Sequence, residues 1–275
     1  MTAALACKAV QGSGHHRSQA PLGGPYQFTF NPHRVTGILL HRFFSESPLT
    51  SDQACLVGVE AHHLLHVLRI GVGDGVILFD GKGAEFRARV EVTGRQKVEL
   101  TIEQQIETDR ELPFALTLGV ALPKGDRQRW LVEKVTELGV SRIVPLHCER
   151  SVVQASRRPS HRLQRAVIEA CKQCGRNCLT EIAPSQDFLE WAGRALPGTL
   201  RLFAHPEASQ RIQELLSREL PAEVEIAIGP EGGFSPKEFA AARYAGWHPV
   251  NLGPRWLRVE TAAVAAVSAV ALGGV

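Results

Sequence analysis

The feature that most constrains the fold of this chain is a regular alternation of strand-like and helix-like segments after Pro113. Short apolar runs alternate there with segments whose apolar side chains recur at helical spacing. Strands joined through helices are connected by right-handed crossovers and lie parallel in one sheet. The pattern therefore predicts an α/β domain over residues 112–275. Its expected strands are 114–122, 143–146, 200–204, 224–228 and 249–252, and its expected helices are 126–139, 160–174, 209–220, 235–245 and 260–272.

Two loops of this domain carry more glycine, proline and charge than turns require. In an open parallel sheet, ligands bind at the carboxyl ends of the strands, where loops lead into helices. The first loop, 228–234, reads IGPEGGF, and a capping box with proline at the first helical position follows it. The second loop, 252–261, contains two arginines, a glutamate and a threonine. Each loop alone could be a tight turn, the second one stabilised by an arginine–glutamate pair, but together they predict a binding site.

The composition excludes several classes of protein. The longest apolar stretch, 261–272, is shorter than the about 18 to 20 residues that a membrane-spanning helix needs. Six cysteines in 275 residues do not form a disulfide framework, so we expect a cytoplasmic protein. A net charge of +3 does not by itself indicate a nucleic-acid partner. No G-x-G-x-x-G motif opens a helix, which argues against a dinucleotide-binding enzyme.

Residues 41–111 show a different pattern, with short strands and one helix. Apolar residues at helical spacing indicate a helix at 61–70, and apolar residues that alternate with charged ones indicate a strand at 86–92. This segment is predicted to be a small β-barrel domain. Its hairpin, 82–97, contains five basic residues and two glutamates, which fits either a solvated edge or a face that contacts RNA.

Residues 1–40 contain no acidic residue and show neither the helical nor the alternating period of a folded segment. We therefore predict a mobile leader. A tail or an over-long start fits this leader better than a transit segment does, because it contains only two serines.

Six motifs, in order along the chain, resemble those of the ribosomal RNA small subunit methyltransferase E family. They are HRFF at 41–44, LPKGDRQRWLVEKVTELGV at 122–140, ERSVV at 149–153, EACKQCGRN at 169–177, GPEGGFSPKE at 229–238 and LGPRWLRVET at 252–261. The resemblance implies a PUA-like β-barrel followed by a C-terminal SPOUT domain with a trefoil knot. It also implies S-adenosylmethionine as cofactor, a homodimer, and methylation of N3 of a uridine in 16S ribosomal RNA. Trp256 and Val259 depart from the family pattern, which has an aliphatic residue and a threonine at these places.

The same resemblance places the cofactor on three loops that each follow a strand. This agrees with the expectation that the carboxyl ends of parallel strands form the site. The cofactor-binding residues would be Leu202, Phe203, Ala204, Gly229, Pro230, Glu231, Gly232, Gly233, Leu252, Gly253 and Leu257.

For catalysis, the protein has to hold the uracil base and stabilise the negative charge that develops when N3 loses its proton. Arg258 is the first candidate for a cation at this place, and Arg255 is the second. Glu260 or Glu231 could accept the proton, although either carboxylate could instead cap a helix or hold an arginine. Because N3 lies on the Watson–Crick edge, the target uridine has to be unpaired during transfer.

A basic stretch in the second domain points to RNA. Residues 150–165 contain five arginines and no acidic residue, a local concentration that predicts contact with phosphates, although a solvated helix face is the alternative. The predicted RNA-binding residues are Lys124, Arg127, Arg150, Arg157, Arg158, Arg162 and Arg165.

Three cysteines, Cys171, Cys174 and Cys178, are spaced in a way that could suggest zinc. The first two, however, continue an apolar helical stripe with Leu163 and Val167, which favours a core position, and no metal is expected.

The prediction as a whole is a dimeric, S-adenosylmethionine-dependent rRNA uridine-N3 methyltransferase whose apolar helix from Thr261 is buried between two subunits. The alternatives are a SPOUT enzyme with another RNA target or a ribose 2′-O target, and a ribosome-assembly protein without catalysis.

Overall fold

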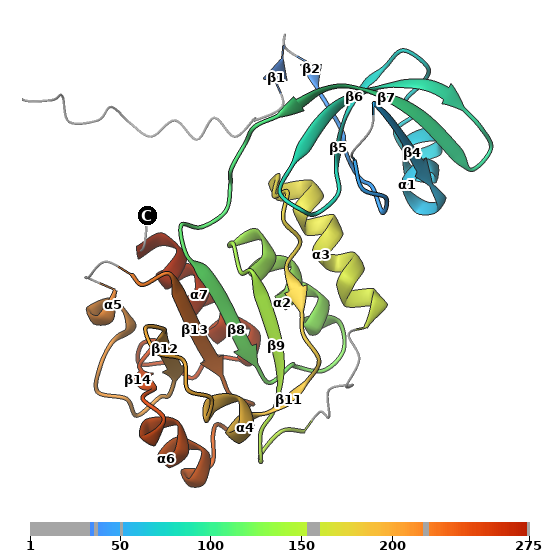
Figure 1. Cartoon of the computed structure of the whole chain (residues 1–275). Helices are drawn as coiled ribbons and strands as arrows, with labels where there is room; N and C mark the ends of the chain where they lie inside the picture. Colours follow the sequence, from blue (N-terminus) through green and yellow to red (C-terminus); the bar gives the residue numbers. More distant parts are fainter. Residues whose placement is uncertain (1–33, 36–37, 50–51, 153–159, 217–219, 274–275) are drawn as a thin grey trace, which may run out of the picture.

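The computed structural model describes residues 34–35, 38–49, 52–152, 160–216 and 220–273, and Figure 1 shows their arrangement. A curled, mostly antiparallel sheet is followed by a parallel sheet with helices on both faces. This confirms the predicted fold class, a small β-barrel domain before an α/β domain. The predicted leader, 1–40, lies outside the described residues except near its end, where Arg34–Val35 (β1) pairs antiparallel with Ile38–Leu39 (β2).

The barrel domain is built on a sheet with the strand order β3-β5-β6-β7-β4. Its strands are β3 (Arg42–Phe44), β4 (Gln53–Val57), β5 (Gly75–Phe79), β6 (Glu85–Thr93) and β7 (Lys97–Ile106). The predicted helix is present as α1 (Gly58–His62), which continues into the π-helical turn η1 (His63–Val67). Along β6, Phe86, Ala88 and Val90 are buried, as the alternation predicted.

The second sheet consists of parallel strand pairs in the order β10-β9-β8-β13-β12-β14, with β11 also paired to β9. Its strands are β8 (Ala115–Val120), β9 (Arg142–His147), β10 (Glu181–Ile182), β11 (Gln186–Asp187), β12 (Leu200–Ala204), β13 (Glu223–Ile228) and β14 (His248–Val250). The helices are α2 (Asp126–Glu137), α3 (His161–Cys174), α4 (Phe188–Ala192), α5 (Ile212–Leu215), α6 (Pro236–Tyr244) and α7 (Val259–Gly273).

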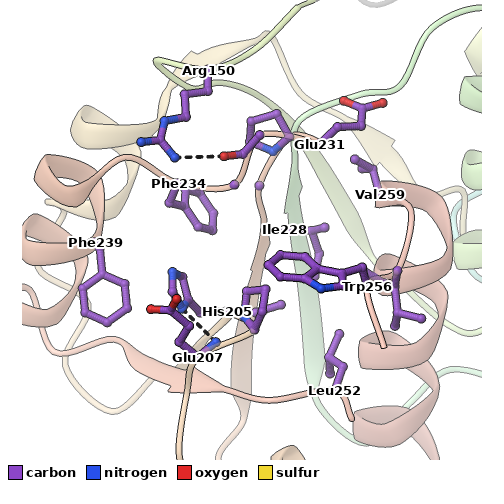
Figure 2. Close-up of a pocket in the computed structure, with 18 of the residues that line it drawn as sticks. Arg150, His205, Glu207, Ile228, Glu231, Phe234, Phe239, Leu252, Trp256 and Val259 are labelled. Carbon is purple, nitrogen blue, oxygen red and sulfur yellow. Dashed lines mark hydrogen bonds between the residues drawn. The ribbon is translucent and has the colours of Figure 1, made fainter. Parts of the chain in front are cut away.

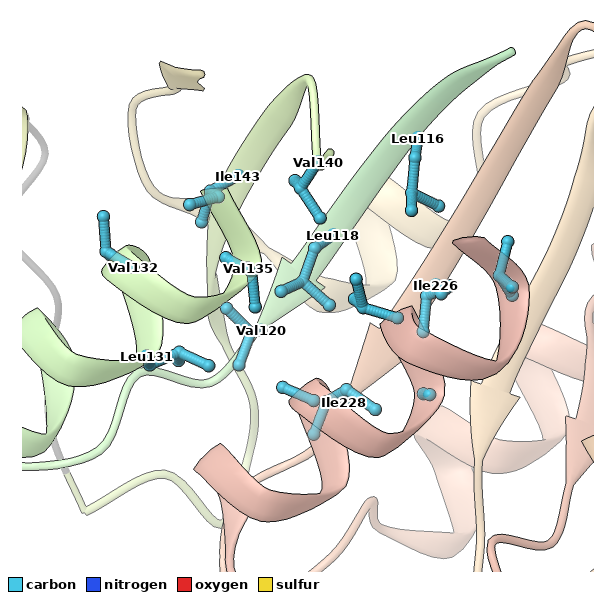
Figure 3. Packing of buried hydrophobic residues seen from close by; sticks show 14 of the residues in the cluster. Leu116, Leu118, Val120, Leu131, Val132, Val135, Val140, Ile143, Ile226 and Ile228 are labelled. Atoms are coloured by element: carbon cyan, nitrogen blue, oxygen red, sulfur yellow. The ribbon is translucent and has the colours of Figure 1, made fainter. Parts of the chain in front are cut away.

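Two apolar layers hold the helices on the sheet. On one face, α2 and α7 pack on the alternate side chains Leu116, Leu118 and Val120 of β8, as Figure 3 shows, and α3, which packs against α2, completes the same core. On the other face, α4 and α6 enclose a second core that contains Trp191 and Trp247. Burying both faces is what a parallel sheet requires. None of the helices among the described residues combines the length and apolarity that a bilayer crossing needs.

The helix α7 is covered on one side within the subunit. Val259, Ala263, Ala266, Val267 and Val270 are buried there, and the helix packs on α2, β8 and β13. On its other side, Val264, Ala265 and Ala269 are partly exposed and Leu272 is exposed. Burial of this side by a second subunit stays a prediction.

The loops after β12 and β14 run side by side. His205 N donates to Val250 O at 2.9 Å, Asn251 N donates to Gln210 O at 2.8 Å, and Ile212 N donates to Asn251 O at 3.3 Å. The chain that leaves β14 thus lies against the segment after β12 before it enters α7. The trefoil knot would be formed by these segments and stays a prediction.

The barrel domain lies at the end of the α/β domain where the parallel strands begin, and it contacts α3 and the segment that follows it (Figure 1). Arg42 on β3 pairs with Glu85 on β6 and also donates to Asn177 Oδ1 at 2.7 Å, just after α3. A second link joins Lys172 Nζ on α3 to Glu60 Oε1 on α1 at 2.9 Å. The carboxyl ends of the strands lie at the opposite end of the domain, about 20 Å away along the six residues of β8.

Candidate functional site

A cavity of about 560 Å³ lies at the carboxyl ends of β12, β13 and β14 (Figure 2). This volume is typical of small-molecule binding sites, which measure about 300 to 1,000 Å³. Three loops enclose it, as the sequence predicted, and Arg150 closes one side from the loop after β9. The lining residues are Ala204, His205, Pro206 and Glu207 after β12, those from Ile228 to Pro236 after β13, Leu252, Gly253, Arg255, Trp256 and Leu257 after β14, and Phe239, Val259 and Ala262 from the helices.

The glycine-rich loop after β13 is fixed by hydrogen bonds within the loop, from Arg150 and at the start of α6. Gly233 N donates to Pro230 O at 2.8 Å, and Gly233 has a φ of 69°, a conformation that favours glycine. Arg150 Nη1 donates to Gly232 O at 3.0 Å. The loop then enters α6 through the predicted capping box, in which Ser235 and Glu238 exchange hydrogen bonds. Its backbone groups are thereby fixed beside the cavity.

Asn251 ties the loop after β14 to the loop after β12. Its Nδ2 donates to Pro206 O at 2.8 Å, and its Oδ1 accepts from Gly253 N at 2.6 Å. Gly253 has a φ of 111°, a conformation that favours glycine, although no atom lies near the position of a Cβ. Asn251 was not predicted as a site residue, because it lay inside the predicted strand 249–252, whereas β14 ends at Val250. A polar residue in an otherwise apolar strand was the signal that could have revealed it.

Most of the predicted cofactor-binding residues line the cavity. Ala204, the five residues 229–233, Leu252, Gly253 and Leu257 all do so. Leu202 and Phe203 do not line it, because their side chains are fully buried in the cores on opposite faces of β12. His205, Glu207 and Phe234 line the cavity and were not predicted, although each lies in a loop that follows a strand.

A second hollow, of about 540 Å³, adjoins the first, since Trp256 and Leu257 line both. Its lining residues are Arg127, Trp130, Trp256, Leu257, Arg258, Glu260 and Thr261. The catalytic candidates are therefore divided: Arg255 lines the cavity, whereas Arg258 and Glu260 line this second hollow.

Arg127 lies between Glu231 and Glu260, the two glutamates predicted as possible proton acceptors. Its Nη1 is 3.4 Å from Glu260 Oε1, and its Nη2 is 3.8 Å from Glu231 Oε1. Both glutamates therefore hold an arginine, which was one of the open alternatives. The Glu260 side chain is 9 % exposed, and its buried Oε2 has no hydrogen-bond partner among the described residues. The Arg258 side chain is exposed and makes no ion pair within the described part of the chain.

The predicted RNA-binding residues differ in how much of their charge is free. Lys124 and Arg165 are exposed, and Arg162 is exposed but pairs with Asp126. Arg157 and Arg158 lie outside the described residues. On the barrel hairpin, Arg87 and Arg89 both pair with Glu103 of β7, so part of the hairpin's positive charge is compensated within the domain.

The apolar stripe predicted both cysteines of α3 in the core, and Cys171 lies there, whereas Cys174 is only partly buried. Cys171 is buried with Leu163 and Val167 in the core under α3. Burial raises the pKa of the Cys171 thiol to about 12, so the thiol is protonated at neutral pH and behaves as a small apolar side chain.

Comparisons with known proteins agree with this architecture. Residues 110–271 match the RNA methyltransferase domain family, and residues 58–103 match the RNA methyltransferase PUA domain family. The ribosomal RNA small subunit methyltransferase E of Synechocystis sp. is 34 % identical over 216 residues, which cover 78 % of this chain and 71 % of that protein. The protein of the same name from Bacillus subtilis is 29 % identical over 247 residues, 84 % of this chain and 96 % of that one.

Solved structures show the same fold with a ligand. The ribosomal RNA small subunit methyltransferase E from Neisseria gonorrhoeae, bound to S-adenosyl methionine, aligns with a TM-score of 0.77 and 33 % identity over 84 % of this chain and 96 % of that one. A methyltransferase from Legionella pneumophila in complex with the cofactor SAM aligns with a TM-score of 0.77 and 32 % identity, and the alignment covers 85 % of this chain and 97 % of that one.

Proposed function

The chain belongs to the ribosomal RNA small subunit methyltransferase E family of S-adenosylmethionine-dependent enzymes, and we propose that the atom it methylates is N3 of a uridine in 16S ribosomal RNA. The observation that carries this proposal is the pair of adjoining hollows. One has the size and lining of a cofactor site, and the other is lined by two arginines and by Glu260, whose buried Oε2 has no hydrogen-bond partner among the described residues. A uracil N3 needs such a pair, because it has to lose a proton while negative charge develops on the ring.

The cavity suits S-adenosylmethionine in size and in chemistry. Ile228, Leu252 and Leu257 offer apolar surface for a purine ring, and Glu207 offers a carboxylate for hydroxyl or amino groups. The fixed backbone of 229–233 offers further hydrogen-bonding groups, which the glycines leave uncovered. When bound, the cofactor supplies a methyl group on a positively charged sulfur.

The chain's own residues prepare the acceptor base. The Arg258 guanidinium, which is free of ion pairs among the described residues, stabilises the negative charge that develops on the uracil carbonyl oxygens. Glu260 is the acceptor of the N3 proton in this proposal, because it lines the hollow and its Oε2 has no hydrogen-bond partner among the described residues. This oxygen is buried, so the carboxylate has to turn toward the hollow to take the proton. Arg127 holds the opposite oxygen of Glu260 and so keeps this carboxylate oriented. Arg255, on the cavity side, is the second cation.

We further propose that the chain divides into a leader (1–40), a PUA-like RNA-binding domain (41–111) and a methyltransferase domain (112–275). It would act in the cytoplasm as a homodimer. The positions of the barrel and the cavity support the dimer. Within one chain, the barrel lies at the end where the parallel strands begin, and the cavity lies at their carboxyl ends. A second subunit could bring its barrel to the cavity. Lys124, Arg150 and Arg165 would contact RNA phosphates.

Primer extension tests the target atom. Methylation at N3 blocks Watson–Crick pairing and stops reverse transcriptase, whereas ribose methylation stops it weakly. We expect a stop at one uridine of 16S rRNA from the parent strain, no stop in a deletion strain, and a restored stop when the gene is returned. A stop that persists in the deletion strain would refute the proposal, and a weak, nucleotide-dependent pause would indicate a ribose target instead.

A further inference from the structure

Both exposed tryptophans of this protein line the second hollow. Of the four tryptophans, Trp191 and Trp247 are buried, whereas Trp130 is 45 % and Trp256 is 86 % exposed. An indole in water is unfavourable, and two of them at one hollow mark a binding surface. We propose that this hollow binds the acceptor nucleobase and that Trp130 and Trp256 are the surfaces on which it stacks. The inference rests on the proposed function and adds the site that receives the unpaired base.

The polar groups of the hollow match the edge of a uracil. This edge presents one N–H donor between two carbonyl acceptors, so its partner needs one acceptor flanked by donors. The hollow is lined by the carboxylate of Glu260, whose buried Oε2 has no hydrogen-bond partner among the described residues, and by the guanidinium groups of Arg127 and Arg258. An apolar protein surface docked in the hollow would leave these polar groups without hydrogen-bond partners. The combination of indole faces and this polar set therefore favours a nucleobase over a protein side chain.

The position of the hollow also fits an acceptor site. Trp256 and Leu257 line both the hollow and the cavity, so a base in the hollow lies directly beside a ligand in the cavity. Methyl transfer requires the reacting atoms to approach to about 3 to 3.5 Å, which only adjoining sites allow. Trp130 and Arg127 come from one face of α2, three residues apart, whereas Trp256 comes from the loop after β14. The hollow thus forms only when the two segments fold together.

Methyl transfer to small ribosomal subunits from the deletion strain tests the proposal. Trp130→Ala is the deciding variant, because Trp130 lines only the hollow and not the cofactor cavity. Loss of stacking of one base lowers affinity by about 5- to 150-fold, from the 1 to 3 kcal/mol that such contacts contribute. We expect a decrease of this size in kcat/KM for the subunit at saturating cofactor, and near-complete recovery in Trp130→Phe. Trp256→Ala should show a decrease of similar size.

The matched control is Tyr244→Ala, because this aromatic residue on α6 is 97 % exposed and lines neither hollow. Its kcat/KM should stay within twofold of the wild type, and the cofactor Kd of Trp130→Ala, measured by calorimetry, should be unchanged. An unchanged kcat/KM in Trp130→Ala would overturn the proposal, as would an equal loss of cofactor affinity. Dissociation of the variant into monomers in sedimentation velocity would assign the tryptophans to a subunit interface instead. If the wild type transfers no methyl group to 16S rRNA, the proposed function itself fails.

Discussion

Removing the carboxylate of Glu85 should destabilise the protein without affecting cofactor binding. Glu85 on β6 has a 2 % exposed side chain and pairs with two arginines, Arg42 and, at 3.2 Å, Arg110. Arg42 is itself buried and also donates to the Arg176 carbonyl oxygen at 3.1 Å and to Asn177. The pair therefore connects the barrel domain to the segment that follows α3. In Glu85→Gln, two guanidinium groups would lose the charge that compensates them.

The expected loss can be given a size. Removing one partner of a buried ion pair costs about 3 to 5 kcal/mol, because the other charge stays buried without compensation. For a chain of this length, each kcal/mol corresponds to roughly 2 to 4 °C in Tm, so Glu85→Gln should lower Tm by roughly 6 to 20 °C. The matched control is Glu99→Gln, since Glu99 pairs with Lys97 in solvent and that pair contributes at most about 1 kcal/mol. Thermal melts monitored by circular dichroism measure both variants.

The same pair makes stability depend on pH. Burial alone would raise the pKa of Glu85, but hydrogen bonds from Arg110 and Arg42 outweigh it and lower the pKa below its ordinary value of 4.5. The stabilisation is therefore complete above pH 4.5 and is lost as the pH falls through the lower pKa of the folded state. The Tm difference between the wild type and Glu85→Gln should be constant near neutrality and shrink in acid. A Tm loss no larger than that of Glu99→Gln, or a difference that does not change with pH, would refute this reasoning.

Three further substitutions test the site. A Cβ at Gly232 would lie 3.2 Å from Arg150 Cβ, so Gly232→Val should push Arg150 from the loop and weaken cofactor binding at least about 100-fold by calorimetry, and normal binding would mean that the cavity is misassigned. Arg258→Ala should lower kcat by about 100- to 1,000-fold and leave the cofactor Kd within twofold, and an unchanged kcat would remove Arg258 from the chemistry. Glu260→Gln keeps the shape of the side chain but cannot take a proton, so single-turnover methyl transfer should fall by at least about 100-fold, and wild-type rates would exclude Glu260 as the base.

The long helices and strands of the α/β domain were predictable because each contains enough residues for its hydrophobic period to be recognised. The ends of β8, β9 and β13 lie within two residues of the predicted ends, and β12 has the predicted bounds. The segment 175–199 contained no predicted element, yet it forms β10, β11 and α4. These elements have two, two and five residues, so none completes the repeats that a periodicity needs. Their positions come from pairing with β9 and from the core around Trp191.

Tertiary contacts also overrode local preferences. The helix predicted over 209–220 is confined, among the described residues, to Ile212–Leu215. Part of the preceding segment is used instead for hydrogen bonds with Asn251, which belongs to a distant loop. At the start of α2, Gly125, with a φ of 67°, occupies the cap position, although the next residue, Asp126, is of a type that commonly caps helices. In both cases the deciding partner or backbone angle is not visible in the local pattern.

The charge of the site shows most clearly what a single sequence cannot convey. Counted along the chain, Arg127 contributes to a basic surface, but in the fold it pairs with Glu231 and Glu260, more than one hundred residues away. Its charge is thereby compensated, so RNA attraction has to come from residues without such partners, such as Lys124 and Arg165. The same pairing links the glycine-rich loop of the cavity to the carboxylate of the second hollow. A change at Arg127 should therefore affect the orientation of Glu260 more than the affinity for RNA.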